Sequence, residues 1–163
     1  MAVQGYSRGQ IALHWIVAVL VAVQFLVEGG IGRAFRQGMR EGGEFVLTGS
    51  ALVHVAAGVL VLVLVLLRLS LRRSRGAPPP PEHDPAWQKL AAAVFHWGLN
   101  AALVAIPVSG LYAWFAASRG AAEVHEVLTS VLLALIGVHA AAALYGEFVQ
   151  KTGVLRRIVL PEK

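Results

Sequence analysis

Four apolar segments dominate this chain of 163 residues, and each is close to the length that a membrane-spanning helix needs. Such a helix takes about 20 apolar residues to cross the hydrocarbon core of a bilayer. The lipid interior offers no hydrogen-bond partners, so a spanning backbone must satisfy its own polar groups as a helix. The segments cover about residues 10–30, 45–69, 85–117 and 124–150. We therefore predict an all-α integral membrane four-helix bundle that forms a single domain over residues 1–163.

The composition excludes several classes of protein. Hydrophobic residues make up 57% of the chain and the mean hydropathy is +0.67, which is too apolar for a soluble domain of this size. The absence of cysteine rules out disulfides, iron–sulfur clusters and thiolate ligation of haem. The loops of a membrane protein explain the net charge of +5, so membrane lipid is a predicted partner and nucleic acid is not. Phosphate-binding, nucleophile-elbow and zinc-protease motifs are missing, which favours electron transfer over hydrolysis.

The distribution of lysine and arginine predicts the orientation of the chain. Four spans place both termini on the same side as the connector at residues 68–81, which is basic and then proline-rich. The opposite side carries a loop at residues 31–44 and a short turn at residues 118–123. The side of the termini holds ten of the 14 basic residues, namely Arg8, Arg68, Arg72, Arg73, Arg75, Lys89, Lys151, Arg156, Arg157 and Lys163. The positive-inside rule therefore places both termini in the cytoplasm.

The fourth apolar segment carries two histidines, His125 and His139, fourteen residues apart. At about 1.5 Å and about 100° per residue, their side chains lie about 21 Å apart along the helix and only about 40° apart around it. One helix therefore directs two imidazoles the same way near opposite faces of the bilayer. Ionisable groups in spans are rare and usually functional, and imidazole is a common ligand of haem iron.

The orientation of the spans converts sequence position into depth. His14 lies in the inner leaflet, level with His139, whereas His54 lies near the outer face, level with His125. The alternative reading, histidines that simply hydrogen-bond within the core, does not explain why the four fall into two level pairs. We predict two b-type haems, the inner one ligated by His14 and His139 and the outer one by His54 and His125.

Other polar residues near the spans each have two readings. Arg68 lies on nearly the same face as His54 at the inner end, and Arg8 lies just below the first span. Each either pairs with a haem propionate or simply anchors its helix at the interface. His96 and Asn100 share a face of the third span at the depth of the inner haem, where they contact a quinone or a propionate, carry protons, or form an interhelical hydrogen bond. The remaining histidine, His83, lies in a loop and has no predicted role.

Four apolar stretches of the chain are GYSRGQIALHWIV, VHVAAGVLVLVLVLLRL, FHWGLNAALVAIPVSGL and VHEVLTSVLLALIGVHAAAAL. They resemble the four helices of bacterial cytochrome b561, and the resemblance covers nearly the whole chain. The YSRGQIALHW start and the two histidines of the last stretch are similar to the superoxide oxidase branch, the superoxide:ubiquinone oxidoreductases. The resemblance implies a bacterial inner-membrane protein with haem ligands at His14, His54, His125 and His139. It also implies an enzyme that transfers electrons from periplasmic superoxide through two haem b groups to ubiquinone.

Charge on the outer side bears on this donor. Five glutamates against four arginines leave that side with a net charge of −1, so a superoxide anion has no overall attraction to it. We predict that a local cluster attracts the anion, because charge is screened within about 8 Å at physiological salt. That cluster consists of Arg33, Arg36 and Arg40.

A different function is also compatible with the same pattern. Similar helices occur in the haem-b membrane subunits of hydrogenases and formate dehydrogenases. The alternative is therefore an anchor subunit that relays electrons for a partner dehydrogenase or hydrogenase. The sequence leaves open whether a redox partner protein or a second copy of the chain binds.

Overall fold

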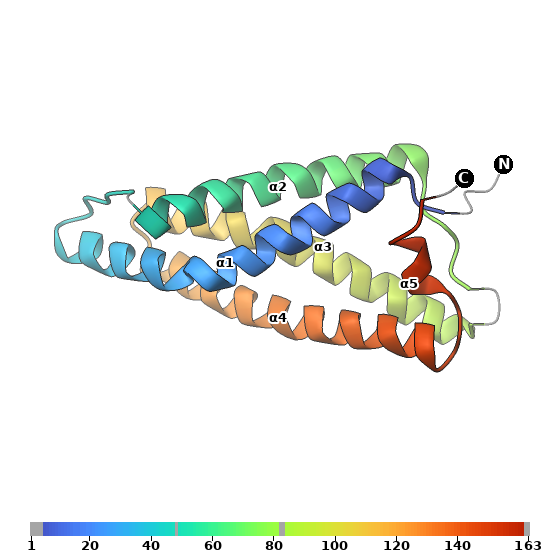
Figure 1. Ribbon diagram of the computed structural model, residues 1–163. Helices are drawn as coiled ribbons and strands as arrows, with labels where there is room; N and C mark the ends of the chain where they lie inside the picture. The colour runs from blue at the N-terminus through green and yellow to red at the C-terminus, as the bar shows by residue number, and fades with distance from the viewer. Residues whose placement is uncertain (1–4, 48, 82–83, 162–163) are drawn as a thin grey trace.

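The computed structural model describes residues 5–47, 49–81 and 84–161, so His83 and Lys163 lie outside the described residues. The described residues form four long helices, α1 (Arg8–Arg40), α2 (Gly49–Arg75), α3 (Ala86–Phe115) and α4 (Arg119–Phe148), followed by the single-turn helix α5 (Val154–Arg157). Each long helix contains a stretch long and apolar enough to cross a membrane. The helices run up and down, so that the start of α1, the α2–α3 connector and α5 lie at one end (Figure 1). The predicted all-α four-helix membrane fold is confirmed.

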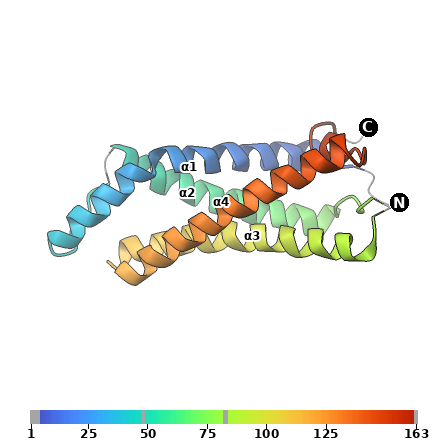
Figure 2. The same ribbon diagram turned by 90° about the horizontal axis from the view of Figure 1, so that it is seen from below.

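Helix α1 continues well beyond the predicted end of the first span. The loop predicted at residues 31–44 is wrong over residues 31–40, which are helical and which we call the α1 extension. Most of these residues are good helix formers and none is proline, so nothing stops the helix before Gly42 and Gly43. Those two glycines take left-handed φ angles of 82° and 96°, and the Gly43 N–H donates to the Gly38 carbonyl at 2.9 Å. The pale blue end of α1 turns away from the direction of the rest of the helix (Figure 2).

Three aromatic rings hold the chain against the α1 extension after it ends. The ring of Phe45 stacks on Phe35 with centroids 5.4 Å apart and lies 4.9 Å from the ring of Trp114 on α3. Gly38 is buried under Phe45, where any larger side chain would collide with that ring. The chain therefore folds back before α2 can begin. This explains why α2 begins at Gly49 and not at residue 45 as predicted.

Two further boundaries differ from the prediction by more than two residues, each for a local reason. Helix α2 continues to Arg75, six residues beyond the predicted end at residue 69, and ends at Gly76 with a left-handed φ of 81° before the proline run. Helix α4 already begins at Arg119, so the turn predicted at residues 118–123 is wrong. Ser118 caps this helix, because its side chain accepts a hydrogen bond from the Ala121 N–H at 3.3 Å. The side chain of Ser118 therefore decides where α4 starts.

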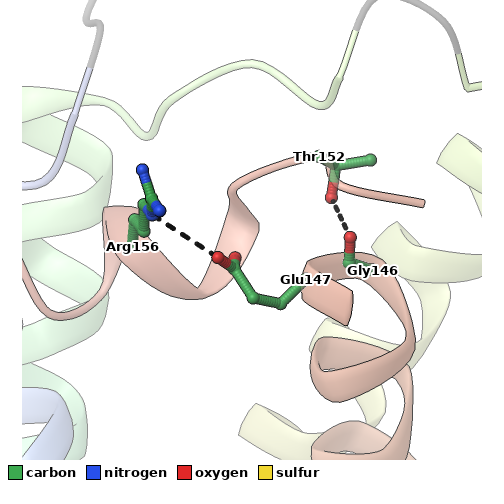
Figure 3. Close-up of polar contacts among 4 residues, drawn as sticks. All are labelled: Gly146, Glu147, Thr152 and Arg156. Carbon is green, nitrogen blue, oxygen red and sulfur yellow. Dashed lines mark hydrogen bonds and ion pairs between the residues drawn. The ribbon is translucent and has the colours of Figure 1, made fainter. Parts of the chain in front are cut away.

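The basic tail folds back on the end of α4 (Figure 3). The Thr152 hydroxyl donates to the carbonyl of Gly146 at 3.0 Å, and Gly153 turns the chain with a left-handed φ of 66°. One turn of helix, α5, then brings Arg156 within 3.5 Å of the Glu147 carboxylate. The tail is therefore a structured part of the inner end and not a free extension.

Two hydrogen bonds attach this tail to other elements. The indole N–H of Trp15 on α1 donates to the carbonyl of Ile158 at 2.9 Å. The Arg157 guanidinium donates to the carbonyl of Pro79 in the α2–α3 connector at 2.8 Å. Residues from three distant parts of the chain thus close the same end of the bundle.

The bundle consists of two helix pairs. Helix α1 packs along α2 and α3 packs along α4, whereas contact between the two pairs is sparser and made mainly by α2 and α3. The buried core is a small apolar layer in the middle of the bundle, made of Val17, Val21, Val61, Val65, Ala102 and Leu132. Leu132 lies seven residues from both His125 and His139, so this layer separates the levels of the two histidine pairs.

Candidate functional site

The structure brings the four predicted ligand histidines together in the two pairs expected from depth. His14 on α1 and His139 on α4 form the inner pair, with ring centroids 6.5 Å apart and planes inclined by 55°. His54 on α2 and His125 on α4 form the outer pair, at 6.2 Å and 66°. All four residues are half-buried. Each pair joins one helix of the α1–α2 pair to α4 on the other side of the bundle.

The spacing of each pair fits a metal ion held between two imidazoles. A metal–imidazole bond of about 2.0–2.1 Å with a ring radius of about 1.1 Å on each side puts two ligating ring centroids roughly 6.3 Å apart. The observed 6.2 and 6.5 Å match this value. Among the described residues there is no group of three or more His, Cys, Asp or Glu side chains that could hold a bare metal ion. Two protein ligands per site suit haem iron, because the macrocycle supplies the other four nitrogens.

Helix α3 orients the ring of His125. Its Nδ1 lies 2.8 Å from the Ile106 carbonyl and 3.4 Å from the Ser109 hydroxyl. A Cβ at Gly110 would lie 2.9 Å from the ring, so the absence of a side chain there lets the imidazole approach α3. A ring N–H donated to a carbonyl leaves the other nitrogen free to bind a metal. The sequence reasoning missed these contacts, because they join residues on two helices.

The rings of His14 and His54 have fewer hydrogen bonds than the ring of His125. The Nδ1 atoms of His14 and His54 are buried and have no hydrogen-bond partner among the described residues. The Gln24 amide donates to the backbone carbonyl of His54 at 2.9 Å. Gln24 had no predicted role, although a glutamine inside an apolar span was a signal for one.

His96 lies between the inner pair and the lipid-facing surface. Its ring stands edge-on to His139 with centroids 5.4 Å apart. His96 itself is exposed, and its neighbour Trp97 is 71% exposed on the outside of the bundle. The Asn100 amide donates to the backbone carbonyl of His96 at 2.6 Å, so it is bound to its own helix. The contact with His139 places His96 at the level of the inner pair, as sequence position predicted.

The two arginines considered for propionates occupy different environments. Arg68 is half-buried on α2 and close enough to His14 and His139 to act on them electrostatically. It has no carboxylate within ion-pair distance in the part of the chain that the structure describes. Arg8 is exposed at the first position of α1. Arg68 is therefore placed to meet an anionic group at the inner site, whereas no contact places Arg8 there.

The three outer arginines line one open pocket on the α1 extension. The pocket measures about 360 Å³ and is lined by Arg33, Arg36, Gln37, Arg40 and Glu41. None of the three has a carboxylate within ion-pair distance among the residues described. Gly30, three residues before Arg33, packs against Ser50, which is one turn before His54. The pocket therefore begins about two helical turns beyond the outer pair.

Comparison with known proteins adds an independent finding. The family model described as prokaryotic cytochrome b561 matches residues 5–161. The chain is 32% identical over 157 residues to cytochrome b562 of Cereibacter sphaeroides, with 96% of each chain covered. It is 27% identical over 178 residues to cytochrome b561 homolog 1 of Escherichia coli strain K12, with 94% of this chain and 96% of the relative covered.

Proposed function

This chain belongs to the prokaryotic cytochrome b561 family, and from that premise we propose that it carries electrons from superoxide to ubiquinone across two haem sites. Family membership makes it a multi-pass bacterial membrane protein that binds haem b and transfers electrons. We place it in the bacterial inner membrane as one four-helix unit, with both termini in the cytoplasm. The observation that carries the proposal is the pair of imidazole rings at each of two depths, spaced as for a ligated iron.

The two pairs have the same role at different depths. His54 and His125 hold the outer haem, and His14 and His139 hold the inner one. Haem b supplies at each site an iron that gains or loses one electron at a time. Arg68 would stabilise a propionate at the inner site through its guanidinium, because none of the carboxylates that the structure describes lies within ion-pair distance of it. The apolar layer between the levels keeps water and protons out of the middle of the bundle.

Superoxide is oxidised at the outer end. The arginines of the α1 extension attract the anion, which loses one electron to the outer site and leaves as O₂. Two superoxide anions must react for each quinone reduced. The three guanidiniums act locally, within the screening length of about 8 Å, so the net charge of −1 on the outer side does not abolish the attraction.

Ubiquinone is reduced at the inner end. His96 donates a hydrogen bond to a quinone carbonyl, since its exposed ring lies against His139 and faces the lipid. Asn100 supports His96 by holding its backbone carbonyl. The reaction takes two electrons from the inner site and two protons from the cytoplasm to give ubiquinol. A donor at this carbonyl lowers the barrier, because the oxygen becomes charged as it is reduced.

Stopped-flow kinetics on the isolated protein in the presence of quinone test the proposal. Superoxide should reduce the haem rapidly, and the rate should fall with added salt. Replacing the three outer arginines with glutamine (Arg33→Gln, Arg36→Gln and Arg40→Gln) should lower the rate at low salt by about tenfold and flatten its salt dependence. Both haem spectra should be retained.

The matched control replaces three exposed arginines at the opposite end of the bundle, Arg72, Arg73 and Arg75, with glutamine. These changes should leave the superoxide reaction unaltered. A slow, salt-independent reaction that the substitutions of Arg33, Arg36 and Arg40 do not affect would argue against superoxide as the donor. It would favour an anchor subunit that relays electrons for a partner dehydrogenase or hydrogenase.

A further inference from the structure

Gln24 places an amide group inside the membrane-spanning part of α1, next to the outer pair. Its Nε2 donates to the backbone carbonyl of His54 on α2 at 2.9 Å. A Cβ at Gly58, one turn after His54, would lie 2.9 Å from the same nitrogen. The space over Gly58 is therefore filled by Gln24, which can reach the carbonyl of His54 only because residue 58 has no side chain. These three residues form one contact between α1 and α2.

Two atoms of this contact lack hydrogen-bond partners. The Oε1 of Gln24 is buried and accepts no hydrogen bond from the described residues, and the same holds for the Nδ1 of His54. An unsatisfied polar group is unfavourable in hydrocarbon, because no water is present to pair it. Here a missing donor and a missing acceptor occur on two residues that already touch. A water that reaches both atoms can pair them, because water both donates and accepts hydrogen bonds.

The two outer histidines differ in whether the Nδ1 atom has a hydrogen-bond partner. The Nδ1 of His125 has an acceptor, the carbonyl of Ile106 at 2.8 Å. Metal-binding histidines nearly always donate their second ring N–H to an oxygen, which fixes the tautomer and makes the ligating nitrogen more basic. The Nδ1 of His54 has no hydrogen-bond partner within the described residues, and the side chain of Gln24 already contacts the backbone of His54. Gln24 therefore brings to His54 an unpaired buried acceptor, its Oε1.

We infer that Gln24 is a positioning residue for His54, and that its amide oxygen accepts the Nδ1–H of His54 directly or through one water. This inference rests on the proposed outer haem. The hydrogen bond makes the imidazole a stronger electron donor, which favours ferric over ferrous iron. Gln24 therefore lowers the reduction potential of the outer haem and leaves the inner haem unaffected, because it lies ten residues after His14 on α1, about 15 Å along the helix.

A redox titration of the purified holoprotein, followed by its haem spectrum, tests this inference. Gln24→Met keeps the length of the side chain and removes the amide. It should raise the outer potential by about the amount of a tenfold change in the ferric–ferrous equilibrium, which is about 59 mV for one electron. The inner potential should not move. Gln24→Glu keeps an oxygen acceptor at the same reach, so its outer potential should stay at the wild-type value or below it.

Two controls make the result specific. His54→Ala identifies which wave of the titration belongs to the outer haem, and Gln88→Met removes an exposed glutamine amide far from both pairs and should shift neither wave. Ferric EPR of Gln24→Met should show a changed g anisotropy for the outer haem alone, and a wild-type or lower outer potential in Gln24→Glu is what a purely structural role would not produce.

The outcomes separate this inference from the proposed function. Two haems with an unmoved outer potential in Gln24→Met overturn the inference and leave the proposed function standing. Loss of the outer haem in Gln24→Met and Gln24→Glu alike also overturns it, because Gln24 would then serve only assembly. A wild-type protein with a single haem would overturn both.

Discussion

The four paired histidines have the same side chain but different surroundings. His125 has its Nδ1 at 2.8 Å from a backbone carbonyl, whereas the Nδ1 atoms of His14 and His54 are buried without a partner among the described residues. His139 has a fifth histidine, His96, edge-on at 5.4 Å. Because hydrogen bonds to the second ring nitrogen set the basicity of a ligating imidazole, the two proposed haems should differ in potential and spectrum.

This difference makes the pairing testable by single substitutions. His54→Ala and His125→Ala should each remove the same haem band, and His14→Ala and His139→Ala the other, because each iron needs both of its axial ligands. Absorbance spectra and a pyridine haemochrome count of the purified variants measure this. If His54→Ala and His139→Ala removed the same band, the pairing by depth would be wrong.

His96 gives a second prediction at this scale. His96→Leu should slow quinone reduction by about 10²-fold, within the range expected for losing a positioned hydrogen-bond donor, while both haem spectra remain. Turnover with a soluble ubiquinone analogue measures the first effect and the absorbance spectrum the second. Loss of the inner haem in this variant would show that His96 supports His139 instead of the quinone.

Among the helices, α3 contributes no histidine to either pair and yet positions one of them. Ile106, Ser109 and Gly110 follow one another within a little more than one turn and all contact His125. The outer site is therefore built from three helices, although its ligands come from two.

Gly110 tests this role of α3. In Gly110→Ala the new Cβ would lie 2.9 Å from the ring of His125, so the ring must move away from Ile106. We expect the outer haem to bind about 10–100-fold more weakly, the usual effect of disturbing a residue that orients a metal ligand. Haem titration of the apoprotein measures it. Gly98→Ala is the matched control, because a Cβ at Gly98 on the same helix would contact nothing within 4 Å; equal effects of the two changes would contradict the proposed role.

At the scale of the molecule, few protein contacts join the two helix pairs. The contacts that hold α1 to α2 and α3 to α4 are much denser than those between the pairs, and the buried core is a single apolar layer. Both histidine pairs bridge this gap, since His14 and His54 lie on one helix pair and their partners lie on α4. Haem bound at the two levels would fill the space above and below the core layer and join the helix pairs.

The orientation in the membrane can be measured without background, because the chain has no cysteine. Glu41→Cys lies at the end of the α1 extension and Gln150→Cys lies just after α4, and both positions are exposed. A membrane-impermeant maleimide should label Glu41→Cys from the periplasm, and Gln150→Cys only after the inner membrane is opened. The reverse pattern would invert the proposed path from an outer donor to an inner acceptor.

Sequence alone determined the class of fold and the depth of the paired histidines. A lipid interior admits only a helix for an isolated apolar segment, and a helix has a constant rise and rotation per residue. The spacing of His125 and His139 therefore sets both their levels and their common direction. Similarly, the four apolar runs and the positions of His14 and His54 within them were sufficient to predict which rings meet. That these rings bind haem iron stays a prediction from their spacing.

Only the tertiary structure decided where the helices end and which groups surround the rings. Residues 31–40 are polar enough for a loop, but Phe35 stacks on Phe45 and against Trp114, and the helix persists. Gln24 at His54 and Ile106 at His125 are contacts between residues 30 and 19 positions apart. The periodicity of apolar residues along the sequence does not predict such pairs, because they depend on how the helices rotate and approach one another. The membrane imposes a helix on each segment separately, and the helix repeat fixes the position of each side chain within that segment. The environment of a metal ligand, by contrast, is made by segments that meet only after folding.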